Sequence, residues 1–310
     1  MPVAINDVSY SGEAASAFIV KSVIGNEIVQ GGHAYVKDGI KKEFTIPRLA
    51  VDNIIQDRTA TPISPTTAKG TAIVDARTLV PADYMVYDEF NPRDFEQHWF
   101  AAQLNPTLID RRLPVTIESV IIQEYLKVHN KFLGKAVMQS DKTNGTAPYK
   151  YFDGFVTRAK ADINVPKVSS PIALAVGGLA TAFQSTLTNI TPDVLYDPAL
   201  KYFVSYKTAQ MWEQEQRTAT YKGVDNTMAG INRFAGRTIV PLFGMPDNTI
   251  LLAKGAADMS SNLWVGMNSI DDATLEFAKL QANSEKYFIK MLMKVDANYG
   301  FGEELSLYSL

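Results

Sequence analysis

The residue types that most often perform chemistry are few in this chain and widely spaced. Cysteine is absent, which excludes disulfides, thiolate zinc sites, iron–sulfur clusters and thiol nucleophiles. The three histidines, His33, His98 and His129, lie too far apart in sequence to suggest a metal-binding motif. Glycine-rich phosphate motifs, the G-x-S-x-G nucleophile motif and the H-E-x-x-H zinc motif are also missing. We therefore predict no catalytic residue, no cofactor and no metal site.

Carboxylates are the remaining candidates for catalysis. The pairs Asp271-Asp272 and Glu303-Glu304 are adjacent in sequence, and adjacent side chains of a strand point to opposite faces. Neither pair forms a chelating site by itself, so we expect solvated charge at both. General acid–base catalysis needs titratable groups held together in a cleft, and the spacing brings none together. We predict that the chain is not an enzyme, although a soluble enzyme with an unrecognised carboxylate site stays an alternative.

The other conspicuous polar and aromatic residues have structural interpretations. His98 lies beside Trp99, and a single histidine among aromatic residues is usually structural. His129 falls in the middle of a predicted helix, where we expect it to face solvent or an interface. Trp212 and Trp264 are expected to pack in a core or an interface instead of binding a ligand.

The overall composition is that of a folded globular protein. A length of 310 residues, with 46% hydrophobic and 20% charged residues, allows one or two domains. The net charge of −3 disfavours a protein that coats nucleic acid, because such proteins are normally basic. No signal peptide is visible, and the longest weakly polar run, 171–183, is shorter than the about 20 residues that span a membrane. We predict no membrane association.

Residues 40–88 predict one long β-hairpin. The outgoing strand, 42–51, and the return strand, 71–80, are both rich in β-branched residues. The connection, 57–70, is small and polar and contains two prolines, and it is far longer than the about 2–5 residues of an ordinary hairpin loop. An isolated two-stranded ribbon is marginally stable in water, so another surface should support it. That surface is either part of the same chain, with the tip as a flexible loop, or a neighbouring subunit.

The remaining elements alternate between helices and strands without a β–α–β rhythm, which predicts the α+β class. A long helix is predicted over 114–139, because its apolar residues recur at steps of three and four. On another face of that helix Lys127, Lys131 and Lys135 recur every fourth residue, which indicates a solvated face or a face turned to phosphate or acidic neighbours. The cleanest strand is 287–295, where every second residue is apolar and the residues between include Lys290 and Lys294, a period of two. Shorter elements are predicted as helices at 171–187, with Ser170 as N-cap, and 207–217, and as strands at 202–205, 238–242 and 249–253.

The order of these parts resembles the major capsid proteins of tailed bacteriophages with the Hong Kong 97-type fold. An arm leads to a long hairpin with a Pro/Thr tip, then to a long amphipathic helix, a compact α/β segment and a long strand near the C-terminus. The likeness extends from about residue 38 to residue 308. It is carried by the segments KYFVSYKTA at 201–209, GRTIVP at 236–241, MPD at 245–247, NLWVG at 262–266 and KYFIKM at 286–291.

The resemblance implies a division into four parts. The long helix would be the spine of the peripheral domain, and the axial domains would surround the hexamer and pentamer axes. The parts would be an N-terminal arm (1–33), an extended loop hairpin (34–88), a peripheral domain (89–145 and 268–300) and an axial domain (146–267 and 301–310).

The function implied by the resemblance is structural. The chain would assemble with itself into hexamers and pentamers that form an icosahedral shell around double-stranded DNA, without sequence-specific binding. Portal, scaffolding and decoration proteins are the expected partners, the virion is the expected location, and assembly is expected in the host cytoplasm. An encapsulin-like nanocompartment that encloses a cargo enzyme is the alternative, since it shares the fold.

The extended loop would lie on the adjacent subunit, and its charges would pair there. Exposed pairs of this kind contribute only ~0–1 kcal/mol each, so they would set register more than affinity. The predicted inter-subunit contacts are Lys41, Lys42, Arg48, Arg58, Lys69 and Arg77, with Asp52, Asp57 and Asp75 as acidic members of the same set.

Two departures from the family pattern produce further expectations. Many members carry a scaffold segment before the arm, whereas here Met1 begins with the arm, so scaffolding would come from a separate protein or be unnecessary. Some members join subunits through a Lys–Asn isopeptide bond. Lys69 is the lysine at the hairpin tip, but no partner asparagine or catalytic acid is apparent, so we expect no crosslink.

Overall fold

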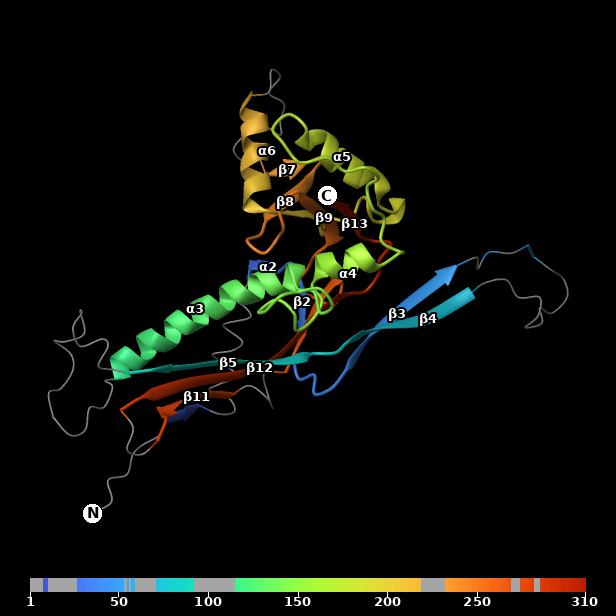
Figure 1. The fold of residues 1–310 in the computed structure, drawn as a ribbon. Coiled ribbons are helices and arrows are strands. Elements are labelled where there is room, and N and C mark those ends of the chain that lie inside the picture. Colours follow the sequence, from blue (N-terminus) through green and yellow to red (C-terminus); the bar gives the residue numbers. More distant parts are fainter. Residues whose placement is uncertain are drawn as a thin grey trace, which may run out of the picture.

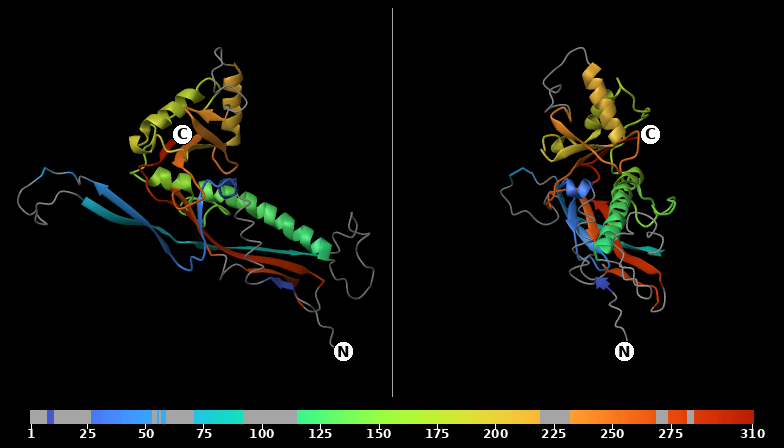
Figure 2. Two further views of the ribbon diagram at one scale, coloured as in Figure 1. Left: turned by 180° about the vertical axis from the view of Figure 1, so that it is seen from behind. Right: turned by 90° about the vertical axis from the view of Figure 1, so that its left-hand side faces the viewer.

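The computed structural model describes residues 8–10, 27–52, 55, 57–58, 71–91, 115–218, 232–268, 274–281 and 285–310. A compact lobe lies above a long helix and a sheet of long strands, and a two-stranded ribbon extends away from the sheet (Figures 1 and 2). Both helices and sheets contribute to the core, which confirms the predicted α+β class.

The long sheet is organised around strand β12 (Tyr287–Tyr299). Its side chains alternate between buried and half-buried along most of the strand, as the sequence pattern predicts, and the strand continues four residues beyond the predicted end. The strand order is β1-β11-β12-β10-β2, and β5 also pairs with β12. The other members are β1 (Val8–Tyr10), β2 (Tyr35–Lys37), β5 (Ala82–Phe90), β10 (Leu263–Met267) and β11 (Thr274–Lys279).

Helix α3 (Val115–Gln139) confirms the predicted long helix and covers one face of this sheet (Figure 1). Its buried residues Leu133, Ala136 and Val137 belong to one hydrophobic cluster with Ile289 and Met291 of β12. Burial of such side chains contributes about 1.5–3 kcal/mol each for the large ones, which explains why the apolar stripe of α3 faces the sheet. The short helix α4 (Phe155–Ala161) follows and packs against the same cluster.

The upper lobe is a second sheet, with the order β13-β9-β6-β8-β7, covered by two helices. Its core is aromatic: the ring of Phe183 lies 5.0 Å from that of Tyr202 and 5.3 Å from that of Trp212, both edge-on. The strands predicted here and the helix at 207–217 are confirmed. The elements are α5 (Leu179–Asn189), the 3-10 helix η2 (Pro192–Val194), β6 (Leu200–Val204), α6 (Tyr206–Thr218), β7 (Arg233–Phe234), β8 (Arg237–Pro241), β9 (Thr249–Lys254) and β13 (Ser306–Ser309).

The predicted helix at 171–187 is wrong in its first eight residues, because α5 begins only at Leu179. Ser170 is not the N-cap and has a left-handed φ of 54°. The helix start is capped from α6, where the carboxylate of Glu215 accepts hydrogen bonds from the backbone N–H groups of Gly177, Leu179 and Ala180 at 2.8–3.1 Å. A distant carboxylate therefore satisfies the free N–H groups, which local sequence could not reveal.

The upper lobe rests on α3 through a close backbone contact. Gly244, in the turn after β8, lies so near α3 that a Cβ atom there would be 1.9 Å from the carbonyl oxygen of Gly134. The side-chain amide of Gln139 donates a hydrogen bond of 2.7 Å to the carbonyl of Gly244. On the neighbouring helix α2 (Glu27–Gln30), the Glu27 carboxylate accepts hydrogen bonds from the Tyr206 hydroxyl and the Phe243 backbone N–H.

The predicted hairpin is confirmed as strands β3 (Phe44–Asp52) and β4 (Thr71–Leu79), which pair antiparallel from Phe44 opposite Leu79 to Asp52 opposite Thr71. Most of its tip, including Lys69, lies outside the described residues. The domain boundaries stay a prediction, but hydrogen bonding places two strands across them. β5 falls partly within the predicted extended loop and β10 within the predicted axial domain, yet both pair with β12.

Among the described residues, no helix is long and apolar enough to cross a membrane.

The expectation that His129 faces solvent or an interface is wrong. The side chain is 3% exposed and its Nε2 lies 2.9 Å from the hydroxyl of Tyr84 on β5. Its ring also contacts that of Phe132 at 6.1 Å. Helix α3 is thus buried over a wider arc than its apolar residues indicate, since a histidine shares the core with a tyrosine partner.

Burial of His129 predicts a loss of stability in mild acid. Burial lowers the pKa of the imidazole to about 4 from its ordinary value of 6.5. Between these values the unfolded chain binds a proton that the folded chain does not, so stability is lost as pH falls from about 6.5 to about 4. We expect His129 to account for about 2 kcal/mol of lost unfolding free energy between pH 7 and pH 5.

Urea unfolding of the purified subunit at the two pH values measures this. His129→Gln should reduce the loss, whereas His33→Gln should retain the His129 contribution, because His33 is a separate half-buried site whose pKa is also lowered to about 4 by burial and by Lys201. Equal pH dependence of wild type and His129→Gln would contradict the assignment.

Candidate functional site

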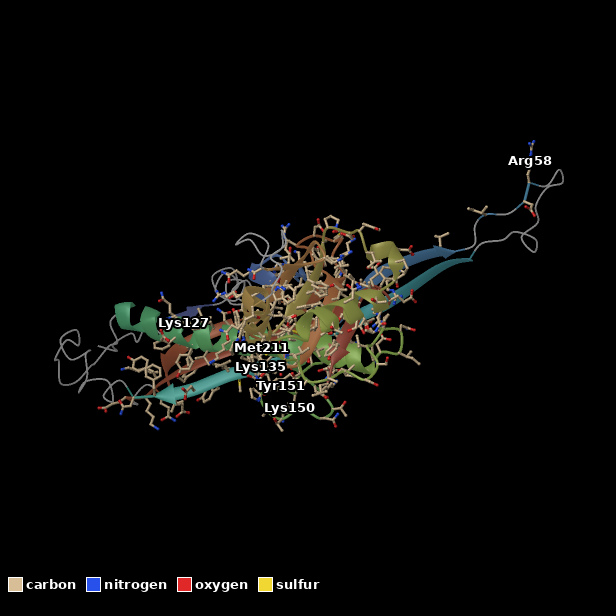
Figure 3. The ribbon with its side chains drawn as sticks, turned by 90° about the horizontal axis from the view of Figure 1, so that it is seen from above. Arg58, Lys127, Lys135, Lys150, Tyr151 and Met211 are labelled. Carbon is tan, nitrogen blue, oxygen red and sulfur yellow. The ribbon has the colours of Figure 1, made fainter. Side chains whose placement is uncertain are left out.

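The ribbon β3–β4 is the candidate functional site. It extends well beyond the rest of the chain, with Arg58 at the far end (Figure 3). Val51 is 49% exposed and Ile55 is 91% exposed. A two-stranded ribbon is marginally stable alone, so the contacts at its base must hold it in position.

The base of the ribbon packs on a small apolar cluster. Ile46 of β3 and Leu79 of β4 are buried against Ile40 and Trp264. The indole ring of Trp264 stacks with Phe44 at 6.2 Å, and its N–H donates a hydrogen bond of 2.8 Å to the carbonyl of Ser261. This packing confirms the structural interpretation of Trp264.

A glycine lets strand β10 approach the ribbon. At Gly266 a Cβ atom would lie 2.8 Å from Cδ1 of Ile40 and 3.3 Å from Cβ of Leu79. These distances are shorter than ordinary van der Waals contacts, so a side chain there would require Ile40 and Leu79 to shift.

A polar cluster ties β4 to the body of the molecule. The guanidinium of Arg77 forms an ion pair with Asp162, which follows α4, and lies 4.5 Å above the ring of Tyr299 on β12. The hydroxyl of Tyr299 donates a hydrogen bond of 2.9 Å to Oδ2 of Asp162. Burial by itself raises the pKa of Asp162, but hydrogen bonds from Arg77, the Asn164 backbone and Tyr299 outweigh it and hold the pKa below its usual range.

The polar cluster continues along β12 to the end of β4. Asp296, only 1% exposed, accepts hydrogen bonds of 2.8 Å from the backbone N–H of Val80 and from Nη2 of Arg158. Burial raises the pKa of Asp296, and Arg158 and two backbone N–H groups offset this only in part. The side-chain amide of Asn298 donates a hydrogen bond of 2.8 Å to the carbonyl of Thr78. We call this set the hairpin anchor; it comprises Arg77, Arg158, Asp162, Asp296, Asn298 and Tyr299.

The six predicted inter-subunit residues fall into three groups. Arg77 belongs to the hairpin anchor, and Arg48 lies 4.7 Å above the ring of Phe301, so both have partners within the subunit. Lys41 and Lys42 are exposed in the segment before β3, and Arg58 is exposed at the far end of the ribbon. Lys69 lies outside the described residues. Contact of any of the six with a neighbouring subunit stays a prediction.

Sequence reasoning missed the partners of Arg77. Asp162 and Tyr299 lie 85 and 222 positions away from it, and no local spacing connects them. Asp296, the other carboxylate of the hairpin anchor, was missed as well. One signal was visible: Asp296 is a carboxylate inside a strongly apolar strand. A buried carboxylate in such a place requires a cationic or N–H partner, which here is supplied by Arg158 and Val80.

An open cleft of about 1030 Å³ lies beside the hairpin anchor. Its carboxylates have structural partners: Asp162 pairs with Arg77, and Asp141 accepts hydrogen bonds of 2.8 Å from the backbone N–H groups of Thr143 and Asn144. Within the described ranges, no group of three or more histidine or carboxylate side chains is arranged to hold a metal ion.

Comparison with known proteins gives structural matches without sequence matches. No family model matches the sequence, and no curated protein does either. A chain of the procapsid of satellite phage P4, a particle that includes the size determination protein, superposes with a TM-score of 0.65 at 9% identity, covering 97% of this chain and 92% of that one. The capsid of an empty GTA particle gives 0.57 at 13% identity, covering 91% and 95%.

Two further matches come from different sources. The capsid of the myovirus XM1 gives a TM-score of 0.56 at 12% identity, covering 92% of each chain. A virus-like particle from Pyrococcus furiosus gives 0.54 at 8% identity, covering 95% of this chain and 98% of that one. The chain therefore has the fold of a phage capsid protein over nearly its whole length, as the sequence resemblance predicts.

The hairpin anchor predicts a specific effect of Arg77→Ala. The substitution removes the ion pair with Asp162 and the contact with Tyr299, and it leaves a largely buried carboxylate without its cation. We expect a loss of about 1–3 kcal/mol in unfolding free energy and faster hydrogen exchange of the β3 and β4 amides. Hydrogen exchange of the unassembled subunit, read by mass spectrometry, measures the second effect.

Arg58→Ala is the matched control, because it removes the same charge from the exposed end of the ribbon and should leave unfolding unchanged. Arg77→Lys should fall between wild type and Arg77→Ala, since it keeps the charge but loses the planar contact with the ring. Unchanged exchange of β3 and β4 in Arg77→Ala would refute the anchoring role.

Proposed function

We propose that this chain is the major capsid protein of a tailed phage, and that it assembles with itself into hexamers and pentamers forming an icosahedral shell around double-stranded DNA. One observation carries the proposal: a fold that phage capsid chains match over 97% and 91% of this chain includes an anchored ribbon that extends away from the long sheet. Each subunit contributes several contacts, and many weak contacts add up to a stable closed shell.

The ribbon is the element that joins neighbours in this proposal. Its base is fixed by the apolar cluster and the hairpin anchor, so its direction is set before assembly. Toward its far end the side chains of Val51, Ile55 and Arg58 are exposed and can contact another subunit. A preset ribbon avoids ordering a flexible segment on contact, which lowers the entropic cost of association.

The proposal extends to partners and location. The shell would occur in the virion and assemble in the host cytoplasm, with portal, scaffolding and decoration proteins as further partners. The division into arm, extended loop, peripheral domain and axial domain is part of the same proposal, with β5 and β10 assigned to the sheet of β12.

A nanocompartment shell that encloses a cargo enzyme is the second candidate, because the virus-like particle from Pyrococcus furiosus also shares the fold. The contents of purified particles distinguish a phage shell from a nanocompartment. Treatment with nuclease followed by extraction should recover protected DNA from a phage shell. Recovery of a co-purifying enzyme without DNA would favour the nanocompartment.

Deletion of residues 58–69 tests the role of the ribbon. We expect the subunit to keep its unfolding midpoint, because the base contacts remain, while particles of megadalton mass disappear from light scattering. A second variant replaces the same residues by a Gly-Ser segment of equal length, which keeps the length of the connection and removes its side chains. This variant should also fail to assemble. Normal particles formed by the deletion variant would overturn the role of the ribbon in assembly. If the wild-type chain itself stays a small oligomer, the result would favour the alternative of a soluble enzyme.

A further inference from the structure

The exposed face of α3 carries a row of lysines. Lys127, Lys131 and Lys135 are four residues apart, which places neighbouring side chains about 6 Å apart along the helix. The side chain of Lys127 is 69% exposed. Figure 3 labels Lys127 and Lys135, which both belong to α3.

Aromatic rings hold two of these ammonium groups in place. Nζ of Lys131 lies 5.3 Å from the ring centroid of Phe243, and Nζ of Lys135 lies 4.8 Å from that of Tyr149. A cation–π contact positions a lysine without neutralising its charge. Among the described residues, neither Lys131 nor Lys135 forms an ion pair, so no carboxylate of this part of the chain competes with an outside anion for them.

The carboxylates near the row are few, and one of them pairs with a lysine of the row. Glu124 pairs with Lys127 at the start of the row. In the turn beside Lys135, Asp141 accepts backbone N–H groups of Thr143 and Asn144, and Asp153 accepts that of Lys142, each at 2.8 Å. Glu124 offsets the charge of Lys127, so among the described residues the part of the row without an ion pair is Lys131 and Lys135.

On the face of the long sheet that points away from α3, the lysines are paired with carboxylates. Side chains of β12 alternate, so those of Lys290 and Lys294 point away from α3. Lys294 lies 3.5 Å from Asp83, Lys290 lies 3.9 Å from Glu276, and Lys286, just before the strand, lies 4.0 Å from Glu89. The two faces of this part of the molecule thus differ in charge, with three cross-strand ion pairs on one and a lysine row on the other.

We propose that the exposed face of α3 is the inner face of the shell and that Lys127, Lys131 and Lys135 bind phosphate groups of the enclosed DNA. This rests on the proposed function. Lysine side chains bind the phosphate backbone of DNA without distinguishing its base sequence. Each lysine–phosphate contact releases counterions that are condensed on the DNA. Three contacts per subunit give a weak attraction that salt abolishes, which suits a wall that must later release its DNA.

Lysine acetylation in intact particles tests which face meets DNA. The particles are compared filled with DNA and after DNA release, and modified lysines are quantified by mass spectrometry. We expect acetylation of Lys127, Lys131 and Lys135 to be severalfold lower in filled particles, with Lys286, Lys290 and Lys294 equal in both. Equal modification of the α3 lysines would overturn the proposal, as would protection in DNA-free particles, which would indicate an acidic protein partner instead.

Binding of a short DNA duplex to the unassembled subunit tests the row itself and does not depend on shell formation. Changing Lys127, Lys131 and Lys135 together to glutamine should reduce the slope of log affinity against log salt by about 2.7, the value for three lost phosphate contacts. The same three positions changed to arginine should keep the slope, and glutamine at Lys286, Lys290 and Lys294 should leave it unchanged. An unchanged slope in the first variant would refute DNA binding by the row, even if particles form.

Discussion

The structure depends on one mechanical constraint: a long two-stranded ribbon must be held from its base. Two strands alone bury little surface, so the direction of the ribbon is set where it meets the body. There an apolar cluster that includes Trp264 packs against Ile46 and Leu79, and an ion pair joins Arg77 of β4 to Asp162. Because this pair is partly desolvated and also bonded to Tyr299, loss of one member leaves a charge without its partner.

Strand β12 connects this constraint to the rest of the fold. Its first part pairs with β5 and β11 and is covered by α3, which forms the largest hydrophobic cluster. Its last part pairs with β10 and supplies Asp296, Asn298 and Tyr299 to the hairpin anchor. The same strand therefore carries both the core and the contacts that orient the ribbon. It also separates the neutralised face of the long sheet from the lysine-bearing face of α3.

Periodicity in the sequence was enough to predict the hairpin, the long helix and the long strand, because each buries one regular stripe of side chains. Periodicity did not predict the features that depend on residues far away in the sequence. Glu215 on α6 caps α5 and replaces Ser170, and Tyr84 on β5 makes a buried position for His129. The hairpin anchor was invisible for the same reason, since Arg77 and Asp162 meet only after the sheet forms. Charge on a strand predicts exposure, and the structure shows that Arg77 has a partner within the subunit.

In the proposed shell, the ribbon is fixed at its base and its far end reaches a neighbouring subunit. An electron cryomicroscopy map of assembled particles tests this most directly. The account predicts hexamers and pentamers in which the base of β3 and β4 keeps the contacts seen here while the far end, near Arg58, lies on the adjacent subunit. A map in which the ribbon folds back onto its own subunit, or in which the far end touches no neighbour, would contradict it.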